Sequence, residues 1–194
     1  TGGGVAEGVR QITPHLAALG VATTVASLDP PEAPWLQDQP FQAIGLGPVA
    51  GSYGYRRGLP ARIRALAQQH DVVIIEGIWQ YHAFASWRAL RGTGIPYFVY
   101  THGMLDPWFK RTYPLKHLKK WTYWPWADYR VLGDATAVLF TTEQERRLAR
   151  QSFWLYEANE LVVGYGTSAP PPDAERQRQA FLQLFPQLRG QRIL

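Results

Sequence analysis

Residues 97–108 read Tyr97-Phe98-Val99-Tyr100-Thr101-His102-Gly103-Met104-Leu105-Asp106-Pro107-Trp108. Four apolar, β-prone residues are followed, after Thr101, by a histidine, a glycine and a turn, a pattern typical of a buried parallel strand that ends in a loop. In open α/β sheets, ligands bind outside the carboxyl ends of the strands. The imidazole of His102 is therefore predicted to lie where such a sheet holds its ligand.

Segments with a strand pattern and segments with a helix pattern alternate along the chain. The predicted strands are apolar throughout, which indicates a parallel sheet that is buried on both sides. The sequence therefore predicts an α/β fold, a Rossmann-like parallel sheet with helices on both faces. Residues 142–145 resemble a capping box that starts a helix. Strands are predicted at 21–28, 41–46, 71–76, 97–100, 137–140 and 161–163, and helices at 5–19, 59–69, 81–90, 115–132 with a break at Pro125, 143–151 and 174–185.

Both ends of the chain indicate a segment of a longer protein. The chain opens on a glycine run at 1–4 with no strand before it, and it closes on residues 191–194, which resemble the start of a strand. We expect residues 1–166 to form one domain that lacks its first strand. We expect residues 167–194 to comprise a proline-rich linker, a helix and the beginning of a following domain.

The composition limits the classes of protein to which the chain can belong. Its 194 residues are 46% hydrophobic, which is enough for one sizeable core. The absence of cysteine excludes disulfides and cysteine-ligated metals and suits a reducing cytoplasm. No apolar run approaches the ~18 residues that span a bilayer. The net charge of +5 favours an anionic partner, whether a nucleotide sugar, a phospholipid or a nucleic acid.

The glycines at the start of the chain form the first candidate site. A glycine turn that opens a helix lets the backbone approach a diphosphate at the positive end of that helix. Gly2, Gly3, Gly4 and Gly8 fit the dinucleotide fingerprint only loosely, and Asp29 is a distant match for its acidic residue. Phosphate binding and plain close packing are equally compatible with this run.

His102 is the second candidate, because it follows a buried strand and precedes a glycine. Asp106 is placed to orient its ring. The alternative is a histidine that a neighbouring group satisfies inside the fold. His82, His102 and His117 are too far apart in sequence for a metal-ligand motif, so no metal site is predicted.

The loop at 77–82 also follows a predicted strand, and it contains Trp79 and Tyr81. Aromatic rings at this position can stack on a sugar ring or on an apolar acceptor. The alternative is that both rings cover the end of the sheet as part of the core.

Residues 102–133 combine six Lys or Arg and two Asp with seven Trp or Tyr. Lysines beside indoles suit a membrane interface, where the lysines meet anionic lipid and the indoles lie at headgroup depth. The same composition can bind single-stranded nucleic acid by stacking, or the rings can be core and the lysines a solvated face. The predicted membrane surface comprises Lys116, Lys119, Lys120, Trp121 and Trp124.

Four blocks occur in an order that resembles the N-terminal half of a GT-B glycosyltransferase of family 4, the retaining group 1 enzymes. The likeness is strongest to members in bacterial exopolysaccharide gene clusters, including heterocyst-envelope polysaccharide enzymes. It extends from Thr1 to about Pro170, and the His102–Trp108 block is its specific part. The four blocks are Gly2-Gly3-Gly4-Val5-Ala6, His102-Gly103-Met104-Leu105-Asp106-Pro107-Trp108, Phe140-Thr141-Thr142-Glu143-Gln144-Glu145 and Val162-Val163-Gly164-Tyr165-Gly166.

The resemblance implies two Rossmann-like domains that face each other across a cleft, the first holding mainly the acceptor and the second mainly the nucleotide sugar. It implies that His102 is catalytic and contacts the donor sugar near the reacting centre. The family's Pro-Asn-Gly is replaced here by residues 163–166, and its acidic E-x7-E motif lies in the second domain, outside this chain. The chain alone is therefore predicted to be catalytically incomplete. Donor contacts are assigned to Gly2, Gly3, Gly4, Thr141 and Glu143, and acceptor contacts to Trp79, Tyr81, Asp106 and Trp108.

The implied reaction is retaining transfer of a hexose from a nucleotide-diphosphate sugar to a hydroxyl of a saccharide or polyprenyl-linked acceptor, in exopolysaccharide biosynthesis. The nucleotide sugar, such as a UDP- or GDP-sugar, is a substrate, and no cofactor, metal or nucleic acid is expected. The implied location is cytoplasmic, with peripheral contact at the inner membrane. The alternatives are a nucleotide-sugar oxidoreductase or epimerase on the same sheet, and a nonenzymatic module that binds a membrane surface or nucleic acid.

Overall fold

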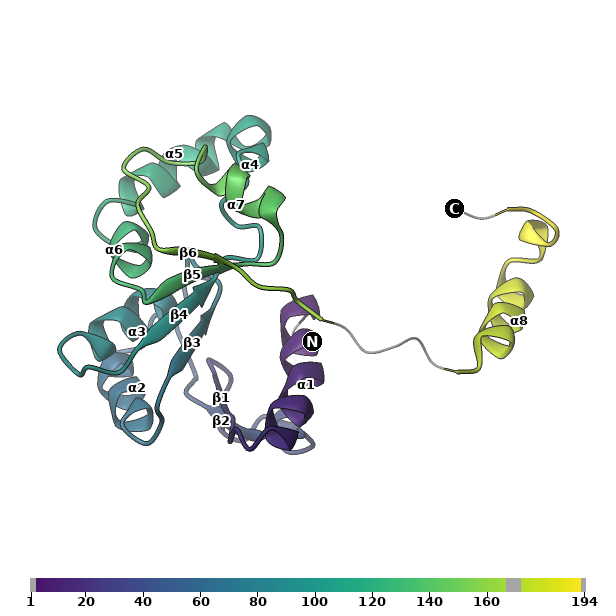
Figure 1. The fold of residues 1–194 in the computed structure, drawn as a ribbon, viewed down its shortest axis with the longest axis horizontal. Helices are drawn as coiled ribbons and strands as arrows, with labels where there is room; N and C mark the ends of the chain where they lie inside the picture. Colours follow the sequence, from purple (N-terminus) through teal and green to yellow (C-terminus); the bar gives the residue numbers. More distant parts are fainter. Residues whose placement is uncertain (1–2, 167–171, 193–194) are drawn as a thin grey trace.

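The structure, a computed structural model, describes residues 3–166 and 172–192 (Figure 1). Helices and strands alternate through most of the chain, as the sequence predicts. The strands are β1 (Thr24–Ser27), β2 (Gln42–Gly45), β3 (Val73–Glu76), β4 (Tyr97–Tyr100), β5 (Ala137–Phe140) and β6 (Glu160–Val162). The helices are α1 (Gly3–Ala18), α2 (Leu59–Ala67), α3 (Tyr81–Leu90), α4 (Trp108–Thr112), α5 (Pro114–Tyr123), α6 (Asp128–Gly133), α7 (Glu143–Ala149) and α8 (Ala174–Leu184), with short 3-10 turns at Pro34–Leu36 and Pro186–Leu188.

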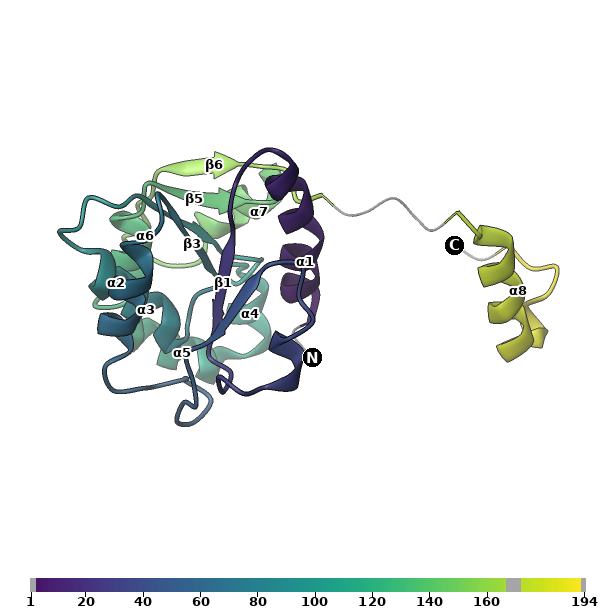
Figure 2. The ribbon, with the colours of Figure 1, turned by 90° about the horizontal axis from the view of Figure 1, so that it is seen from below.

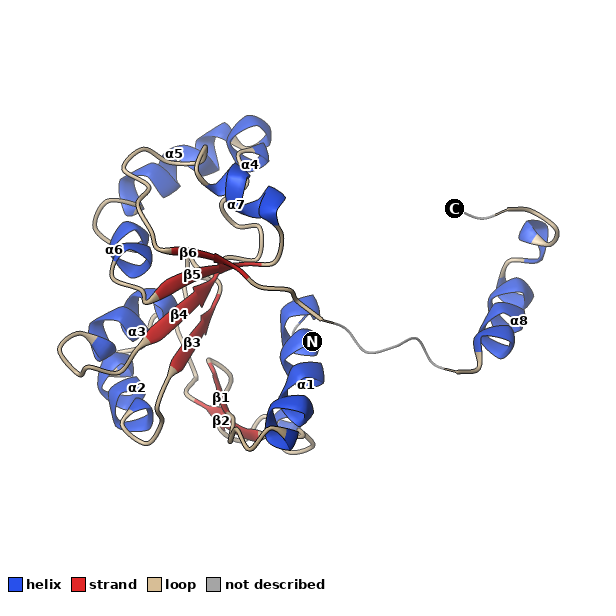
Figure 3. Ribbon diagram, viewed as in Figure 1, coloured by secondary structure: helices blue, strands red, loops and turns tan. Residues whose placement is uncertain are grey.

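All the strand pairs in these residues are parallel, which confirms the predicted fold class. They form two sheets, a pair β1-β2 and a four-stranded sheet in the order β3-β4-β5-β6 (Figure 3). In the larger sheet Glu76 lies level with Tyr100, and Tyr100 lies level with Leu139. The loops that leave β3, β4 and β5 therefore begin at the same edge.

The two faces of the four-stranded sheet are covered unequally. Crossovers between neighbouring parallel strands are almost always right-handed, so helices that connect strands in the order β3-β4-β5-β6 are expected on one side of the sheet. In Figure 1, α2, α3, α5, α6 and α7 lie to the left of and above this sheet, whereas α1 lies to its right, and α8 lies farther away on that side. Ile75, Val99 and Val138 on the covered face are buried, whereas Ile74 and Leu161 on the other face are 49% and 47% exposed. Helices flank both faces as predicted, but most of the core lies on one side.

The connection from β4 to β5 contains three helices and adds one large aromatic ring, that of Trp124, to the core. The helix predicted at 115–132 is interrupted at Pro125 as expected, with α5 before the break and α6 after it. Trp124 is fully buried and stacks on Phe153 at 4.7 Å between ring centroids. The sequence pattern did not indicate α4, because a five-residue helix bounded by prolines has no periodicity to read.

The C-terminal helix α8 stands apart from the rest of the chain in both views (Figures 1 and 2). No hydrogen bond or ion pair joins residues 172–192 to residues 3–166. Gln191 and Arg192, where a strand was expected to begin, are not in a strand. Most of the predicted linker and the last two residues lie outside the described part of the chain.

Candidate functional site

Two residues with unusual backbone conformations lie at the carboxyl ends of neighbouring strands. His102 follows β4 with a φ of 47°, and Trp79 follows β3 with a φ of 72°. Neither is a glycine, and such a conformation costs roughly 1–3 kcal/mol. Residues of this kind cluster at functional sites, where the surrounding contacts hold them. Their position matches the edge at which ligands bind in α/β sheets.

The His102 ring is bound by a carboxylate from the adjacent strand. Its Nε2 lies 2.5 Å from Oε2 of Glu76, the last residue of β3, and the two side chains are mostly buried, 12% and 29% exposed. Because a carboxylate only accepts hydrogen bonds, Nε2 carries the proton and donates it. Asp106, predicted to orient this ring, instead accepts a hydrogen bond from the backbone N–H of Trp108 at 2.7 Å. Glu76 is not among the site residues predicted from the sequence, although a charged residue that ends an apolar strand is a readable signal.

Two tyrosines complete the surroundings of the imidazole. Tyr100 stacks on His102 at 5.4 Å between ring centroids, and Tyr165 lies edge-on to it at 5.6 Å. The Tyr165 hydroxyl reaches across to α1 and donates to the carbonyl of Val5 at 3.4 Å. The ring of Tyr165 therefore lies between the histidine and the first turns of α1.

The predicted glycine site is described in part. Gly2 lies outside the described residues, whereas Gly3 and Gly4 are exposed at the start of α1. Since Val5 in the same helix contacts Tyr165, the structure brings the beginning of α1 to the neighbourhood of His102.

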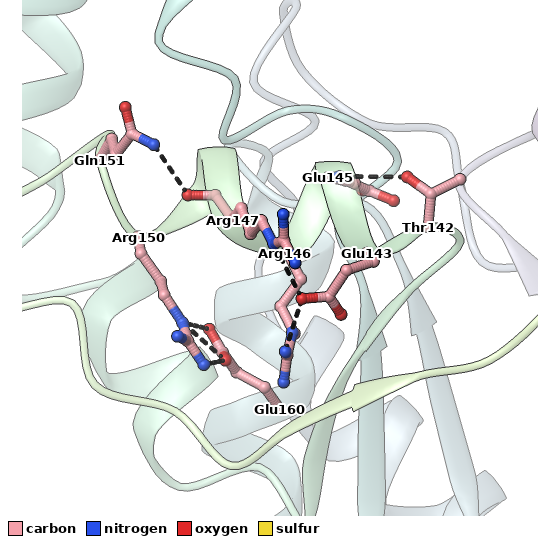
Figure 4. A network of polar contacts seen from close by, with 8 residues as sticks. All are labelled: Thr142, Glu143, Glu145, Arg146, Arg147, Arg150, Gln151 and Glu160. Atoms are coloured by element: carbon pink, nitrogen blue, oxygen red, sulfur yellow. Dashed lines mark hydrogen bonds and ion pairs between the residues drawn. The ribbon is translucent and has the colours of Figure 1, made fainter.

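The loop that follows β5 meets the His102 loop through a glutamate. The carboxylate of Glu145 accepts hydrogen bonds from Thr101 and Gly103 after β4 and from Thr141 after β5. One of the two hydrogen bonds of the predicted capping box is formed: the Thr142 hydroxyl accepts from the Glu145 N–H at 3.0 Å (Figure 4). The Glu145 side chain accepts from Thr141 instead of from the Thr142 N–H.

Glu143, the predicted donor contact, faces the other way. It pairs with Arg146 at 2.7 Å and with Arg147 at 3.1 Å on the surface of α7 (Figure 4). The hydrogen bond from Arg146 is the main cause that lowers the pKa of Glu143. In this conformation the acidic group that reaches the His102 loop is Glu145.

A shallow cavity of about 290 Å³ lies beside this junction. Its volume lies at the lower end of the range of small-molecule sites, and it opens to solvent. Its position lets a ligand contact the loops after β4 and β5 together. It is lined by Gly103, Asp106, Thr141, Thr142, Gln144, Glu145 and Leu148.

The rings of Trp79 and Tyr81 pack largely inside the protein. The Trp79 indole N–H donates to the Met104 carbonyl at 3.1 Å, and the ring packs on Phe153. Tyr81 is 6% exposed and packs on Tyr53, so in this conformation it cannot stack on an acceptor. The packing of both rings agrees with the alternative stated for this loop, in which they cover the end of the sheet as part of the core.

A buried carboxylate holds the Trp79 loop. Asp128 is 0% exposed, and its Oδ2 accepts a hydrogen bond from the Trp79 backbone N–H at 3.1 Å. Its Oδ1 has no hydrogen-bond partner among the described residues. Burial raises the pKa of Asp128 to about 7, against the opposing effects of that hydrogen bond and of nearby Lys120.

Only part of the predicted membrane surface is exposed in the structure. Trp124 is 1% exposed and donates its indole N–H to the Trp154 carbonyl, so it belongs to the core and not to a surface. Lys120 is half-buried, with its ammonium 4.4 Å from the centroid of the Trp79 ring. Lys116, Lys119 and Trp121 remain exposed.

Other exposed apolar side chains adjoin them. Leu115 and Leu118 are 83% and 64% exposed on α5, and Trp154 stacks on Trp121 at 5.8 Å between ring centroids. We call this surface the α5 patch; it comprises Leu115, Lys116, Leu118, Lys119, Trp121, Trp154 and Leu155.

Within residues 3–166 and 172–192, no helix has the length and apolar character needed to cross a bilayer. The same residues contain no cluster of three or more His, Cys, Asp or Glu side chains placed to bind a metal ion.

Comparison with known protein families shows the family to which the chain belongs. A family model, the glycosyl transferase 4-like domain, matches residues 3–166. This range begins with α1, includes all six strands and ends at Gly166, just after Tyr165. A search of curated proteins and a search of solved structures returned no match. The match includes each element that contributes to the surroundings of His102, and the chain belongs to the glycosyl transferase 4-like domain family.

Proposed function

We propose that this chain is the acceptor-side half of a retaining GT-B glycosyltransferase. The family match supports glycosyl transfer in general. The donor we propose is a nucleotide-diphosphate hexose, and the acceptor is a hydroxyl of a saccharide or polyprenyl-linked sugar in exopolysaccharide synthesis. The observation that carries the proposal is the histidine at the carboxyl end of β4, held by Glu76 in a strained conformation.

In the proposed reaction, the bond between the anomeric carbon and the diphosphate oxygen breaks while a bond to the acceptor oxygen forms on the same face. The acceptor proton passes to the departing phosphate oxygen, and no protein nucleophile or separate cofactor takes part. His102 contacts the sugar as a fixed dipole. Because its Nε2 already donates to Glu76, we assign it an orienting and electrostatic role instead of general base catalysis.

The remaining contacts divide between the two substrates. We propose that Gly3, Gly4 and Thr141 approach the donor, and that Asp106 and Trp108 on the accessible side of the His102 loop approach the acceptor. The residues that hold the rest of the donor are proposed to lie in a second domain after residue 166.

The test offers UDP-, GDP- and ADP-sugars to the protein that carries this chain together with the proposed second domain. Release of nucleoside diphosphate is followed for wild type, His102→Ala, Glu76→Gln and, as a control, Glu157→Gln on an exposed loop. We expect turnover of one donor and a loss of about 10²–10³-fold for His102→Ala, the usual effect of removing an oriented electrostatic contact. Absence of release with every donor and a membrane extract as acceptor source would contradict the proposal.

We further propose that the α5 patch rests on the anionic face of the inner membrane, where a lipid-linked acceptor is presented. Exposed leucines and indoles beside lysines match the composition of interfacial helices. The two lysines of the patch, Lys116 and Lys119, supply the complementary charge. A protein bound in this way is cytoplasmic and peripheral.

Sedimentation with phosphatidylcholine vesicles, with and without phosphatidylglycerol, tests this surface. Each exposed lysine near an anionic bilayer contributes about 1 kcal/mol, so Lys116→Ala with Lys119→Ala should weaken binding about 30-fold. The matched control removes two exposed charges of α8, Arg176→Ala with Arg178→Ala. Equal losses in the two double variants, or no binding of wild type to anionic vesicles, would refute a patch-specific contact.

A further inference from the structure

One carboxylate joins the two loops that frame the candidate site. Glu145 lies in the first turn of α7, and its Oε1 accepts from the Thr101 hydroxyl at 2.9 Å and from the Gly103 N–H at 2.7 Å. Its Oε2 accepts from Thr141 twice, from the N–H at 2.9 Å and from the hydroxyl at 2.8 Å. All four donors point at this side chain, which is unusual for a residue that only caps a helix.

Two of these donors flank His102 in the sequence. Thr101 is fully buried, and Gly103 has a φ of 72°, so the residues on both sides of His102 are restrained. His102 itself has a left-handed φ of 47°, a conformation that persists only where the surrounding contacts over-determine it. The bonds to Glu145 are contacts of this kind.

An ionised carboxylate suits these donors better than an amide. Burial raises the pKa of Glu145, but the hydrogen bonds from Gly103, Thr141 and Thr101 outweigh burial and leave the pKa below its usual value. A glutamine has one acceptor oxygen, and its NH₂ group would face two of the donors. Replacement of Glu145 by glutamine therefore removes about half of the restraint with little change in shape.

We propose that Glu145 is a positioning residue for His102, holding the backbone on both sides of the histidine while Glu76 holds its ring. The inference rests on the proposed role of His102 in glycosyl transfer. Its structural part can be tested independently of that role, because it concerns the placement of the imidazole in this chain.

The first experiment measures the His102 ring proton resonances by NMR in the chain without substrate, assigned with His102→Ala. Since the ring stacks on Tyr100 and lies edge-on to Tyr165, ring currents shift these resonances. We expect Glu145→Gln to move them toward the values of an exposed histidine. Glu143→Gln, which removes the same charge two residues away, should leave them in place. Unmoved resonances in folded Glu145→Gln would overturn the proposal.

A second pair of variants covers the case in which Glu145→Gln fails to fold. Thr101→Val removes one donor beside His102, and Thr141→Val removes one donor from the loop after β5. The proposal expects the ring resonances to move more in Thr101→Val than in Thr141→Val. Equal effects would indicate a general structural role and would contradict it.

Kinetics of the protein with its proposed second domain separate this inference from the proposed function. A displaced catalytic group lowers kcat, and a misplacement of about 1 Å costs on the order of 10²-fold. We expect Glu145→Gln to lower kcat with little change in the donor KM. If Glu145→Gln moves the His102 ring resonances but the wild-type protein turns over no donor, the proposed glycosyl transfer is refuted and the positioning role of Glu145 is retained. Turnover that is unchanged in Glu145→Gln would refute the positioning role alone.

Discussion

At the scale of the residue, the site depends on two residues whose backbone has a conformation that glycine adopts most easily. His102 and Trp79 both have a positive φ and both follow a strand of the four-stranded sheet. Each is held by a carboxylate, Glu76 on the imidazole and Asp128 on the Trp79 backbone. The cost of the strain is offset by contacts that only the complete fold supplies.

The strain at His102 predicts which of two substitutions that remove the imidazole is the more stable. His102→Ala and His102→Gly both lose the bond to Glu76, but only alanine retains a Cβ at a φ of 47°. We expect His102→Gly to be the more stable by about 1 kcal/mol in urea unfolding, because an L-residue in the left-handed region costs 1–2 kcal/mol. A more stable His102→Ala would show that the loop relaxes when the imidazole is absent.

Asp128 predicts a dependence of stability on pH. Its pKa is raised by burial to about 7 in the folded chain, so the folded state holds the proton more tightly than the unfolded state. Its contribution is complete below about pH 4, where both states are protonated, and is lost as the pH rises toward 7. At about 1.4 kcal/mol for each pKa unit, the loss is about 4 kcal/mol.

Asp128→Asn removes this titration and keeps an oxygen for the Trp79 N–H. The free energy of unfolding of wild type should therefore fall more steeply between pH 4 and pH 7 than that of the variant. Parallel curves from denaturant titrations over this range would show that the carboxylate titrates normally.

At the scale of the element, α1 meets the four-stranded sheet region through Tyr165. A Cβ built on Gly8 would lie 2.2 Å from the Tyr165 hydroxyl, so the helix and the ring approach closely only because residue 8 is a glycine. Glycine inside a helix costs about 1 kcal/mol relative to alanine. This contact, and not helix formation, accounts for the glycine.

A double-mutant cycle tests the contact. Gly8→Ala should gain about 1 kcal/mol in a Tyr165→Ala background, where helix propensity alone acts. In the wild-type background the gain should be absent or reversed, because the Tyr165 ring must move. Equal effects of Gly8→Ala in both backgrounds, measured by thermal unfolding, would place Tyr165 away from α1.

At the scale of the whole molecule, the family match and the packed body both end near residue 166. Residues 172–192 share no hydrogen bond or ion pair with residues 3–166, so they should add little to the stability of the body. A chain that ends at Gly166 should unfold within about 2 °C of the 194-residue chain. A larger fall in Tm would reveal a contact between α8 and the body.

The order of the strands and helices could be read from the sequence because its signals are local. Residues 81–90 are helical, 97–100 form a strand, and α5 ends just before Pro125, all as predicted. Runs of apolar residues, glycines and prolines determine the backbone conformation only within a few positions along the chain. The division into two sheets and the uneven cover of the larger sheet could not be read in this way, because they depend on strand order.

The sequence by itself determined the fold class and the placement of His102 at the carboxyl edge of a parallel sheet. Only the tertiary structure decided which groups surround it. Glu76 lies 26 residues away from His102, and the two meet because β3 and β4 pair in register. Glu145, not Glu143, reaches the same loop because the first turn of α7 turns one side chain inward and the other toward solvent. Such pairings are set by strand register and helix orientation, which local sequence patterns do not encode.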